Sequence, residues 1–236
     1  MTGGVSGGGG TWAVLPVKPL RGALRRLTPA LDAPVRRALQ VAMLTDVLAA
    51  IAGARALAGV VVVTSDPEAR GMAEAIAGAR VVPDHDPPRG MNAAVVRGLE
   101  AVAAAGADGA LVVTADLPLA RPEDLDAVLA AAPPGPSATL APSRDGTGTN
   151  AMLLRPPAAL TPRLGVDSLA RHLHQAGRRG VTVARVERPN LALDIDTPRD
   201  LAELMARGGA GATLEACARL AIAGLLAAGS PAGGAR

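Results

Sequence analysis

The sequence predicts an α/β protein, a three-layer α/β/α sandwich in which helices cover both faces of a mostly parallel sheet. Short apolar runs alternate with longer helical segments along most of the chain, at the spacing of βαβ units. The runs are almost wholly apolar instead of alternating with polar residues, which is typical of strands buried on both faces. Because the chain has no Phe, no Tyr and a single Trp, Trp12, its core must consist of Ala, Val, Leu and Ile.

The first half of the chain opens with the apolar run Thr11–Val17, followed by a helix over 34–52. Asp32 is suited to cap this helix, because an Asp side chain accepts hydrogen bonds from free N-terminal amides, and Gly53 ends it. The Pro-rich residues 83–91 are typical of a loop. The other elements expected here are strands over 60–64, 79–82 and 110–114, and helices over 67–77, 92–105 and 122–132, the last begun by Pro122.

The second half continues the alternation, and we assign residues 11–207 to one domain. Thr197 is suited to cap its last helix. Residues 1–10 have the composition of a flexible tail, and residues 208–236 form a Gly/Ala-rich extension. Its apolar stretch 214–226 is expected to be helical and could pack on the domain, stay mobile or form the contact of a homodimer. The elements expected in this half are strands over 137–142, 151–154, 181–186 and 191–193, and helices over 166–177 and 198–207.

The composition excludes several classes of function. The formal net charge is only +3, and the arginines are scattered along the chain. Since aromatic side chains for base stacking are also missing, we expect no nucleic-acid partner. The sequence shows no signal peptide and no apolar run of about 18 residues, so we expect a cytoplasmic protein without a membrane partner. The single cysteine, Cys217, excludes an internal disulfide and is expected to be a buried, inert thiol.

Two acidic motifs carry the strongest chemical signal. Thr114–Pro118 follows a buried strand, so Asp116 is expected in the ligand crevice at the carboxyl end of the sheet, where it could hold a divalent cation. In Leu193–Pro198, Asp194 and Asp196 would face the same way in extended chain, and one could be a metal ligand opposite Asp116. Two such carboxylates suit a magnesium–triphosphate site. The alternative is that they are turn or helix-start residues.

Two further motifs could bind anions. Arg144–Asn150 alternates glycines with hydroxyl residues, which allows close approach of the backbone to a ligand, although a plain hairpin turn is the alternative. Arg163–His172 places Ser168 at the start of a helix, where its hydroxyl and free backbone amides could bind a carboxylate or phosphate. Its alternative is an ordinary helix cap.

The remaining charged residues give weaker signals. A basic segment lies where a phosphate-binding loop would sit after the first strand, although it has no Walker A sequence and could be a solvated loop. The cations of this segment are Lys18, Arg21, Arg25 and Arg26. The three histidines, His85, His172 and His174, form no metal-binding pattern and are expected on the surface or in loops.

Taken in order, these segments resemble one family, the guanylyltransferases of deazaflavin coenzyme F420 biosynthesis, which act on 2-phospho-L-lactate or phosphoenolpyruvate. The resemblance covers roughly residues 12–207 and is specific because many short pieces occur in the same order. The matching pieces are Pro16–Leu20, Arg26-Leu27, Ala42–Asp46, Gly90–Ala94, Asp116–Pro118, Gly146–Asn150, Arg163–Gly165, Asp167-Ser168, Ala170–His172 and Asp194–Pro198.

The resemblance implies a nucleotide-diphospho-sugar transferase-like fold, as in the molybdenum cofactor guanylyltransferases. It also implies a reaction in which the phosphate of a small three-carbon acid attacks the α-phosphorus of GTP and pyrophosphate leaves. The implied roles are Mg²⁺ binding and catalysis by Asp116 and Asp194, acid binding by Thr149, Gly165 and Ser168, and GTP binding by Lys18, Arg26 and Asn92.

One segment departs from the family pattern. Relatives usually have Ala-Lys-Ser/Thr-Arg-Leu where this chain has Ala23–Leu27, so Leu24 replaces a lysine and Arg25 a small hydroxyl residue. Arginine does not reproduce the compact charge of lysine. This departure motivates one alternative, a non-catalytic GTP-binding relative. The other alternative is a molybdenum-cofactor or sugar-phosphate nucleotidyltransferase.

Overall fold

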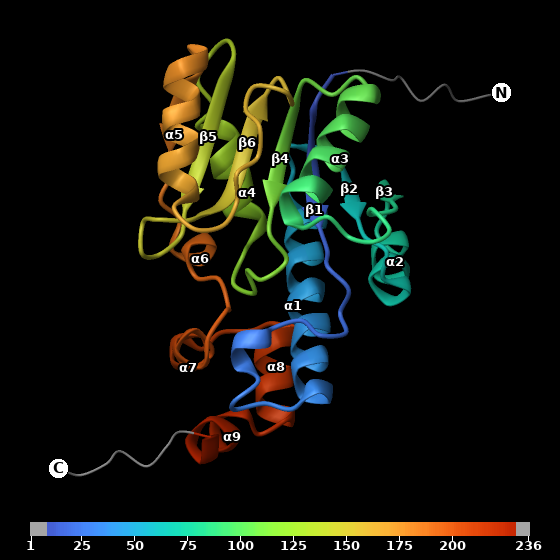
Figure 1. Cartoon of the computed structure of the whole chain (residues 1–236), viewed down its shortest axis with the longest axis vertical. Coiled ribbons are helices and arrows are strands. Elements are labelled where there is room, and N and C mark those ends of the chain that lie inside the picture. The colour runs from blue at the N-terminus through green and yellow to red at the C-terminus, as the bar shows by residue number, and fades with distance from the viewer. Residues whose placement is uncertain (1–8, 230–236) are drawn as a thin grey trace.

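The computed structural model describes residues 9–229, which contain one seven-stranded sheet of order β3-β2-β1-β4-β6-β5-β7 (Figure 1). Only β6 is antiparallel to its neighbours, so the expected mostly parallel sheet is confirmed. The tail predicted over residues 1–10 lies almost wholly outside the described residues. The strands are β1 (Thr11–Pro16), β2 (Leu57–Val63), β3 (Ala79–Val82), β4 (Gly109–Val113), β5 (Ser137–Pro142), β6 (Thr149–Arg155) and β7 (Thr182–Arg185).

The helices begin where the sequence offers caps. The Asp32 carboxylate accepts a hydrogen bond from the Val35 amide at 2.9 Å, and Thr197 forms a reciprocal capping box with Asp200. Within residues 9–229, none of the helices has the length and apolar character needed to cross a membrane. The helices are α1 (Ala33–Gly53), α2 (Pro67–Glu74), α3 (Met91–Ala104), α4 (Pro122–Ala130), α5 (Ser168–Arg179), α6 (Pro189–Ala192), α7 (Pro198–Arg207), α8 (Ala212–Arg219) and α9 (Ile222–Gly229).

Two hydrophobic layers form the core, one on each face of the sheet. Helices α1, α2, α4 and α6 contribute to the layer on one face, and α3 and α5 to the layer on the other. Successive residues of β1 point to opposite layers, since Ala13 and Leu15 belong to the first and Val14 to the second. The predicted α/β/α sandwich is therefore present, built almost entirely from aliphatic side chains.

Helix α3 lies unusually close to the sheet because of one glycine. A Cβ atom at Gly98 would overlap Cγ1 of Val14 on β1 and would lie 3.1 Å from Cγ2 of Val63 on β2. Any larger residue would push the helix away from both strands. Gly98 thereby fixes the position of the α3 N-terminus, which lies at the carboxyl edge of the sheet.

The C-terminal segment packs on the domain as a third hydrophobic cluster. Figure 1 shows α8 beside the lower part of α1, and the buried residues Ala216, Cys217 and Ile222 face this cluster. The Asp46 carboxylate on α1 accepts hydrogen bonds from the Ala212 and Thr213 amides, at 2.7 and 2.9 Å, and so caps α8. The expected burial of Cys217 is confirmed, and burial raises its thiol pKa to about 11.

Two element predictions are wrong. The expected helix over 214–226 is divided into α8 and α9, because Ala221 between them has a left-handed backbone with φ of 50°. The strand expected over 191–193 is instead the end of the short helix α6, which Pro189 begins. The Asn150 side chain donates to the Leu191 carbonyl at 2.9 Å and so satisfies a backbone group that a strand would have paired.

Candidate active site

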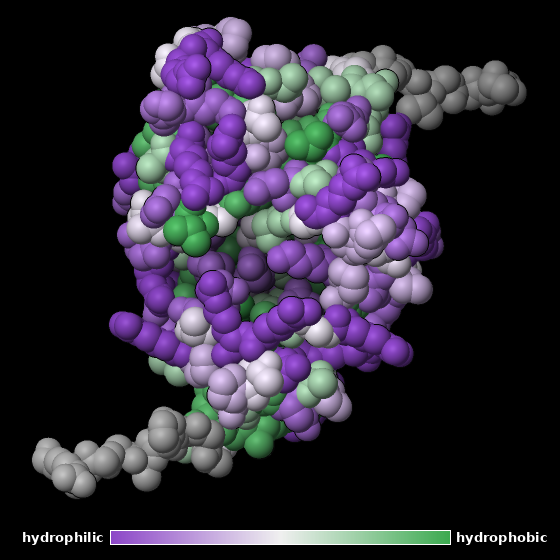
Figure 2. Space-filling model, in the orientation of Figure 1, coloured by the Kyte–Doolittle hydropathy of each residue, from purple (hydrophilic) through white to green (hydrophobic). Residues whose placement is uncertain are grey.

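The site is assembled at the carboxyl edge of the sheet. Asp116 follows β4, and the Ile195 amide donates to the Asp116 carbonyl at 3.0 Å. This bond holds the segment with Asp194 and Asp196 beside the end of β4. Figure 2 shows the molecule hollowed near this edge, with mainly hydrophilic residues around the opening. The structure therefore brings together the two acidic motifs that the sequence separates by almost 80 residues.

A β-bulge in β6 shifts the alternation of its side chains, so that Thr149 faces α5 and Asn150 faces α6. Ala141 pairs with Ala151 and Pro142 with Thr149, so Asn150 has no partner on β5. Asn150 donates to the α6 carbonyls and, at 3.2 Å, to Oδ1 of Asp194. Thr149 contacts α5 on the other face. One irregularity thus connects the acidic side of the site with the α5 side.

Asp116 and Asp194 form a carboxylate pair that no ion pair neutralises within residues 9–229. Oδ1 of Asp116 is buried and has no hydrogen-bond partner among the described residues. The pKa of Asp116 is raised to about 6, chiefly by burial; the charges of Asp194 and Asp196 contribute to the rise, and a Thr114 hydrogen bond opposes it. Burial also raises the pKa of Asp194, opposed by its bond from Asn150. A cation between the two carboxylates would remove this repulsion.

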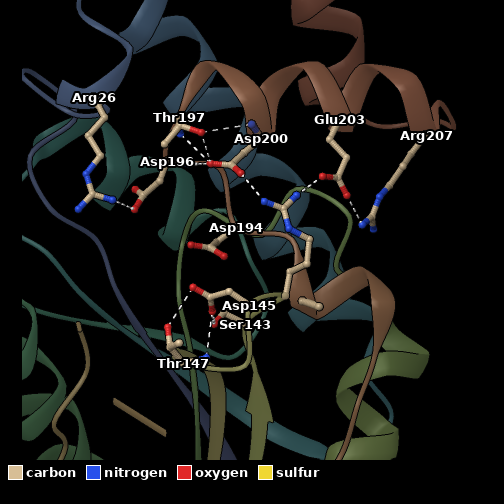
Figure 3. Close-up of polar contacts among 12 residues, drawn as sticks. Arg26, Ser143, Asp145, Thr147, Asp194, Asp196, Thr197, Asp200, Glu203 and Arg207 are labelled. Atoms are coloured by element: carbon tan, nitrogen blue, oxygen red, sulfur yellow. Dashed lines mark hydrogen bonds and ion pairs between the residues drawn. The ribbon is translucent and has the colours of Figure 1, made fainter. Parts of the chain in front are cut away.

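The neighbouring acidic residues have their own counter-charges (Figure 3). Arg26 pairs with Asp196 at 2.8 Å, both largely exposed. Arg144 pairs with Asp200 at 2.9 Å and also with Glu203. In the described part of the chain, no ion pair reaches Asp116 or Asp194, and no group of three or more metal-ligating side chains occurs. Two protein carboxylates suit Mg²⁺, which takes its other ligands from phosphate and water.

The loop between β5 and β6 is a hairpin turn whose polar groups bind one another. Asp145 accepts hydrogen bonds from the Ser143 hydroxyl at 2.6 Å and from the Thr147 amide and hydroxyl at 3.0 Å (Figure 3). The Ser143 bond is the main cause that lowers the pKa of Asp145 to about 2. The Thr147 carbonyl accepts from the Leu169 amide at 3.0 Å, which ties the loop to α5. The loop thus places Thr149 and does not itself present free hydroxyls.

The start of α5 has the features of an anion site. Gly165 has φ of 114° and the adjacent turn includes Asp167 at 53°, so the segment before the helix is sterically unusual. The hydroxyl of Ser168 is buried and finds no hydrogen-bond partner within residues 9–229. An unpaired hydroxyl at a helix N-terminus suits an anionic oxygen. Thr149, Gly165 and Ser168 therefore lie around one end of α5, and their binding of an acid stays a prediction.

His172 corrects the prediction that all three histidines lie on the surface or in loops. It is fully buried on α5, one turn after Ser168, whereas His174 is exposed. Its Nδ1 lies 3.2 Å from the Thr149 hydroxyl, and its Nε2 accepts from the Arg163 amide at 3.0 Å. Burial, helped by the charge of Arg163, lowers its pKa to about 4. The four-residue spacing from Ser168 was the sequence signal, since such residues share a helix face.

The three residues expected to bind GTP form no hydrogen bond with one another within residues 9–229, and each has a different environment. Lys18 is exposed after β1, and Arg26 is engaged with Asp196. Asn92, at the start of α3, uses its side chain on the Leu164 backbone, accepting from its amide at 2.7 Å and donating to its carbonyl at 3.1 Å. Beside Asn92 lies an open hollow of about 750 Å³ between α3, the loop after β3 and residues 161–162. Their GTP contacts stay predictions.

Comparisons with known proteins agree with this geometry. The family described as "Guanylyl transferase CofC like" matches residues 11–230. The phosphoenolpyruvate guanylyltransferase of Rubrobacter xylanophilus is 44% identical over 198 residues, which cover 84% of this chain and 95% of that protein. The protein of the same name from Conexibacter woesei is 43% identical, over 86% of this chain and 93% of its own length.

Solved structures share the fold at low sequence identity. A protein from Desulfovibrio desulfuricans G20, named for the nucleotide-diphospho-sugar transferases, has a TM-score of 0.71 and 15% identity over 94% of this chain and 99% of its own. A nucleotidyl transferase from Methanothermobacter has a TM-score of 0.56 and 21% identity, over 82% and 94% of the two chains. The predicted nucleotidyltransferase fold is confirmed, and the chain belongs to the CofC-like guanylyl transferase family.

Proposed function

We propose that this chain transfers GMP from GTP to phosphoenolpyruvate and releases pyrophosphate, as a step of coenzyme F420 biosynthesis. The observation that carries the proposal is the unneutralised pair Asp116 and Asp194, connected through β6 to the anion site at the start of α5. Such a site suits two anionic substrates that must be brought together. The names of the relatives, phosphoenolpyruvate guanylyltransferase, support this acid over 2-phospho-L-lactate.

Asp116 and Asp194 would hold Mg²⁺. The buried, unpartnered Oδ1 of Asp116 and the mutual repulsion of the two carboxylates fit a divalent cation. When bound, the ion would neutralise charge on the triphosphate and on the leaving pyrophosphate. The task of Asn150 is to orient Asp194, whose Oδ1 receives its amide hydrogen.

Thr149, Gly165 and Ser168 would bind the acid. The two hydroxyls can donate to its carboxylate, and the backbone near Gly165 can approach it closely because this residue has no side chain. Holding the carboxylate leaves the phosphate of the acid free to face GTP. A phosphate oxygen then attacks the α-phosphorus, and the bond from that phosphorus to the bridging oxygen breaks. No general base is required, because a phosphate dianion is already a nucleophile.

Lys18, Arg26 and Asn92 would lie on the GTP side. Arg26 is exposed and held only by the exposed Asp196, so its guanidinium can exchange this partner for a phosphate at little cost. Guanine must be recognised without Phe or Tyr, through hydrogen bonds to its edges and aliphatic packing. The cytoplasmic location stays a prediction. The homodimer also stays a prediction. The side of α8 that packs on α1 is buried within the chain and cannot form its interface.

Pyrophosphate release from GTP and Mg²⁺ tests the proposal, with phosphoenolpyruvate, 2-phospho-L-lactate and 3-phosphoglycerate compared as acceptors. We expect turnover with phosphoenolpyruvate, and a loss of about 100-fold or more in kcat for Asp116→Asn with an unchanged circular dichroism spectrum. Glu74→Gln, an exposed carboxylate on α2, is the matched control. Absence of release with every acid would refute the function, and normal activity of Asp116→Asn would refute the metal assignment.

A further inference from the structure

His172 makes two hydrogen bonds that together fix where its ring carries a proton. The Arg163 amide lies 3.0 Å from Nε2, and a backbone N–H can only donate. Nε2 must therefore present a lone pair, and in the neutral ring the proton is on Nδ1. Nδ1 lies 3.2 Å from Oγ1 of Thr149. The ring accordingly donates to the Thr149 hydroxyl.

This bond determines which way the Thr149 hydroxyl points. Its oxygen already receives the Nδ1 proton, so its own hydrogen cannot be directed at the ring and needs another acceptor. No second partner of Oγ1 occurs in the described part of the chain, and Thr149 is only 5% exposed. The unpartnered Ser168 hydroxyl lies one helical turn from His172. Two hydroxyl donors thus lack an acceptor at the start of α5.

We infer that His172 is a positioning residue for the acceptor acid, which turns the Thr149 hydroxyl into a fixed donor to the acid's carboxylate. The inference rests on the proposed function, because the carboxylate is the group that receives this hydrogen. His172 also anchors the Arg163 backbone, while Asn92 anchors the next residue, Leu164. The segment that leads to the acid is therefore held from both α5 and α3. Such preorganisation removes the need to reorient the donor when the acid binds.

Two substitutions separate the hydrogen bonds of the ring. His172→Asn places an amide N–H near the position of Nδ1 and can still donate to Thr149. His172→Gln places a carbonyl near the position of Nε2 and can still accept from Arg163, but it loses the donor to Thr149. We expect His172→Gln to raise the KM for phosphoenolpyruvate about 10- to 100-fold, with the KM for GTP unchanged. His172→Asn should keep the KM for phosphoenolpyruvate within about threefold of the unsubstituted protein.

Thr149→Val provides the second half of a double-mutant cycle. Without the hydroxyl, His172→Gln should cause no further rise in the KM for phosphoenolpyruvate, so the two effects would be strongly non-additive. Independent, additive effects would overturn the inference, as would equal KM changes in His172→Gln and His172→Asn. Should His172→Gln fail to fold, His172→Ala, which also lacks the donor to Thr149, takes its place in the cycle with Thr149→Val.

Nitrogen-15 NMR of the histidine rings gives a readout that does not depend on activity. At pH 7.5 we expect His172 to show a protonated Nδ1 and an unprotonated Nε2. A proton on Nε2, or a charged ring, would overturn the inference. The two failures are distinguishable, because an absence of pyrophosphate release with every acid refutes the proposed function, whereas the ring nitrogens report His172 alone.

Discussion

Acidification should destabilise this protein through His172 in a way that can be calculated. Burial lowers the pKa of this histidine from 6.5 to about 4 in the folded chain. The unfolded chain therefore binds the proton more readily, so the stabilising contribution is complete above pH 6.5 and is lost as the pH falls towards 4. The full difference corresponds to about 3 kcal/mol, of which about 2 kcal/mol is already lost at pH 5.

Urea unfolding followed by circular dichroism, at pH 8, 6.5 and 5, measures this loss. His172→Gln removes the titrating ring, so its stability deficit against the unsubstituted protein should shrink by about 2 kcal/mol between pH 8 and pH 5. Burial raises the pKa of Asp116 to about 6, which gives a dependence of the opposite sign, but this residue is present in both proteins and cancels in the difference. His174→Gln, on the exposed side of the same helix, is the control. A constant difference between the two proteins at all three pH values would refute the reasoning.

Two further predictions concern packing. Gly98→Ala should lower the free energy of unfolding by about 1–3 kcal/mol, because the new Cβ would overlap Val14. Gly71→Ala on α2, where the space around the glycine is open, should raise the free energy of unfolding by up to about 1 kcal/mol. Similar effects of the two substitutions in thermal unfolding would contradict the close approach of α3. Asp46→Ala should lower the free energy of unfolding by about 1–2 kcal/mol and speed trypsin cleavage beside α8, because it removes the cap on the amides of Ala212 and Thr213. Unchanged digestion would contradict the docking of α8 on α1.

Most of the fold could be predicted because local and global signals agree. A strand covered by a helical layer on each face needs an apolar run with no polar side. The chain has such a run at each strand except the short edge strands β3 and β7. Caps such as Asp32 and Thr197 mark helix starts within one residue. The failure at 191–193 occurs where a distant contact overrides a local pattern. Asn150 satisfies the α6 carbonyls from 41 and 42 residues away, which no local reading of 191–193 includes.

The candidate site was predictable in its residue types and not in its contacts. Asp116 follows from the rule that ligands bind beyond the carboxyl ends of strands, whereas the choice of Asp194 over Asp196 came from the family resemblance. The contacts could not be predicted because they depend on the folded arrangement. The hydrogen bonds between Asn92 and Leu164 join residues 72 positions apart, and His172 is buried only because its face of α5 meets the sheet. The resemblance assigned Asn92 to the nucleotide side, and the structure places its side chain against the backbone of Leu164, next to Gly165, which is proposed to bind the acid. It is therefore positioned to connect the two halves of the site.

The antiparallel direction of β6 explains why the metal side and the acid side can meet. Val113 at the end of β4 pairs with Ala151, so Thr149 begins β6 where β4 finishes. A parallel strand in this place would begin at the opposite edge, about 20 Å away for seven residues, and Thr149 would be remote from Asp116. The bulge at Asn150 is the second requirement. Strict alternation would turn Thr149 to the face of Ala151 and away from His172, whereas the extra residue lets Asn150 reach Asp194 while Thr149 reaches α5. Deleting Asn150 would therefore leave Thr149 facing α5 but remove the contact with Asp194 that links the residues proposed for the metal and for the acid.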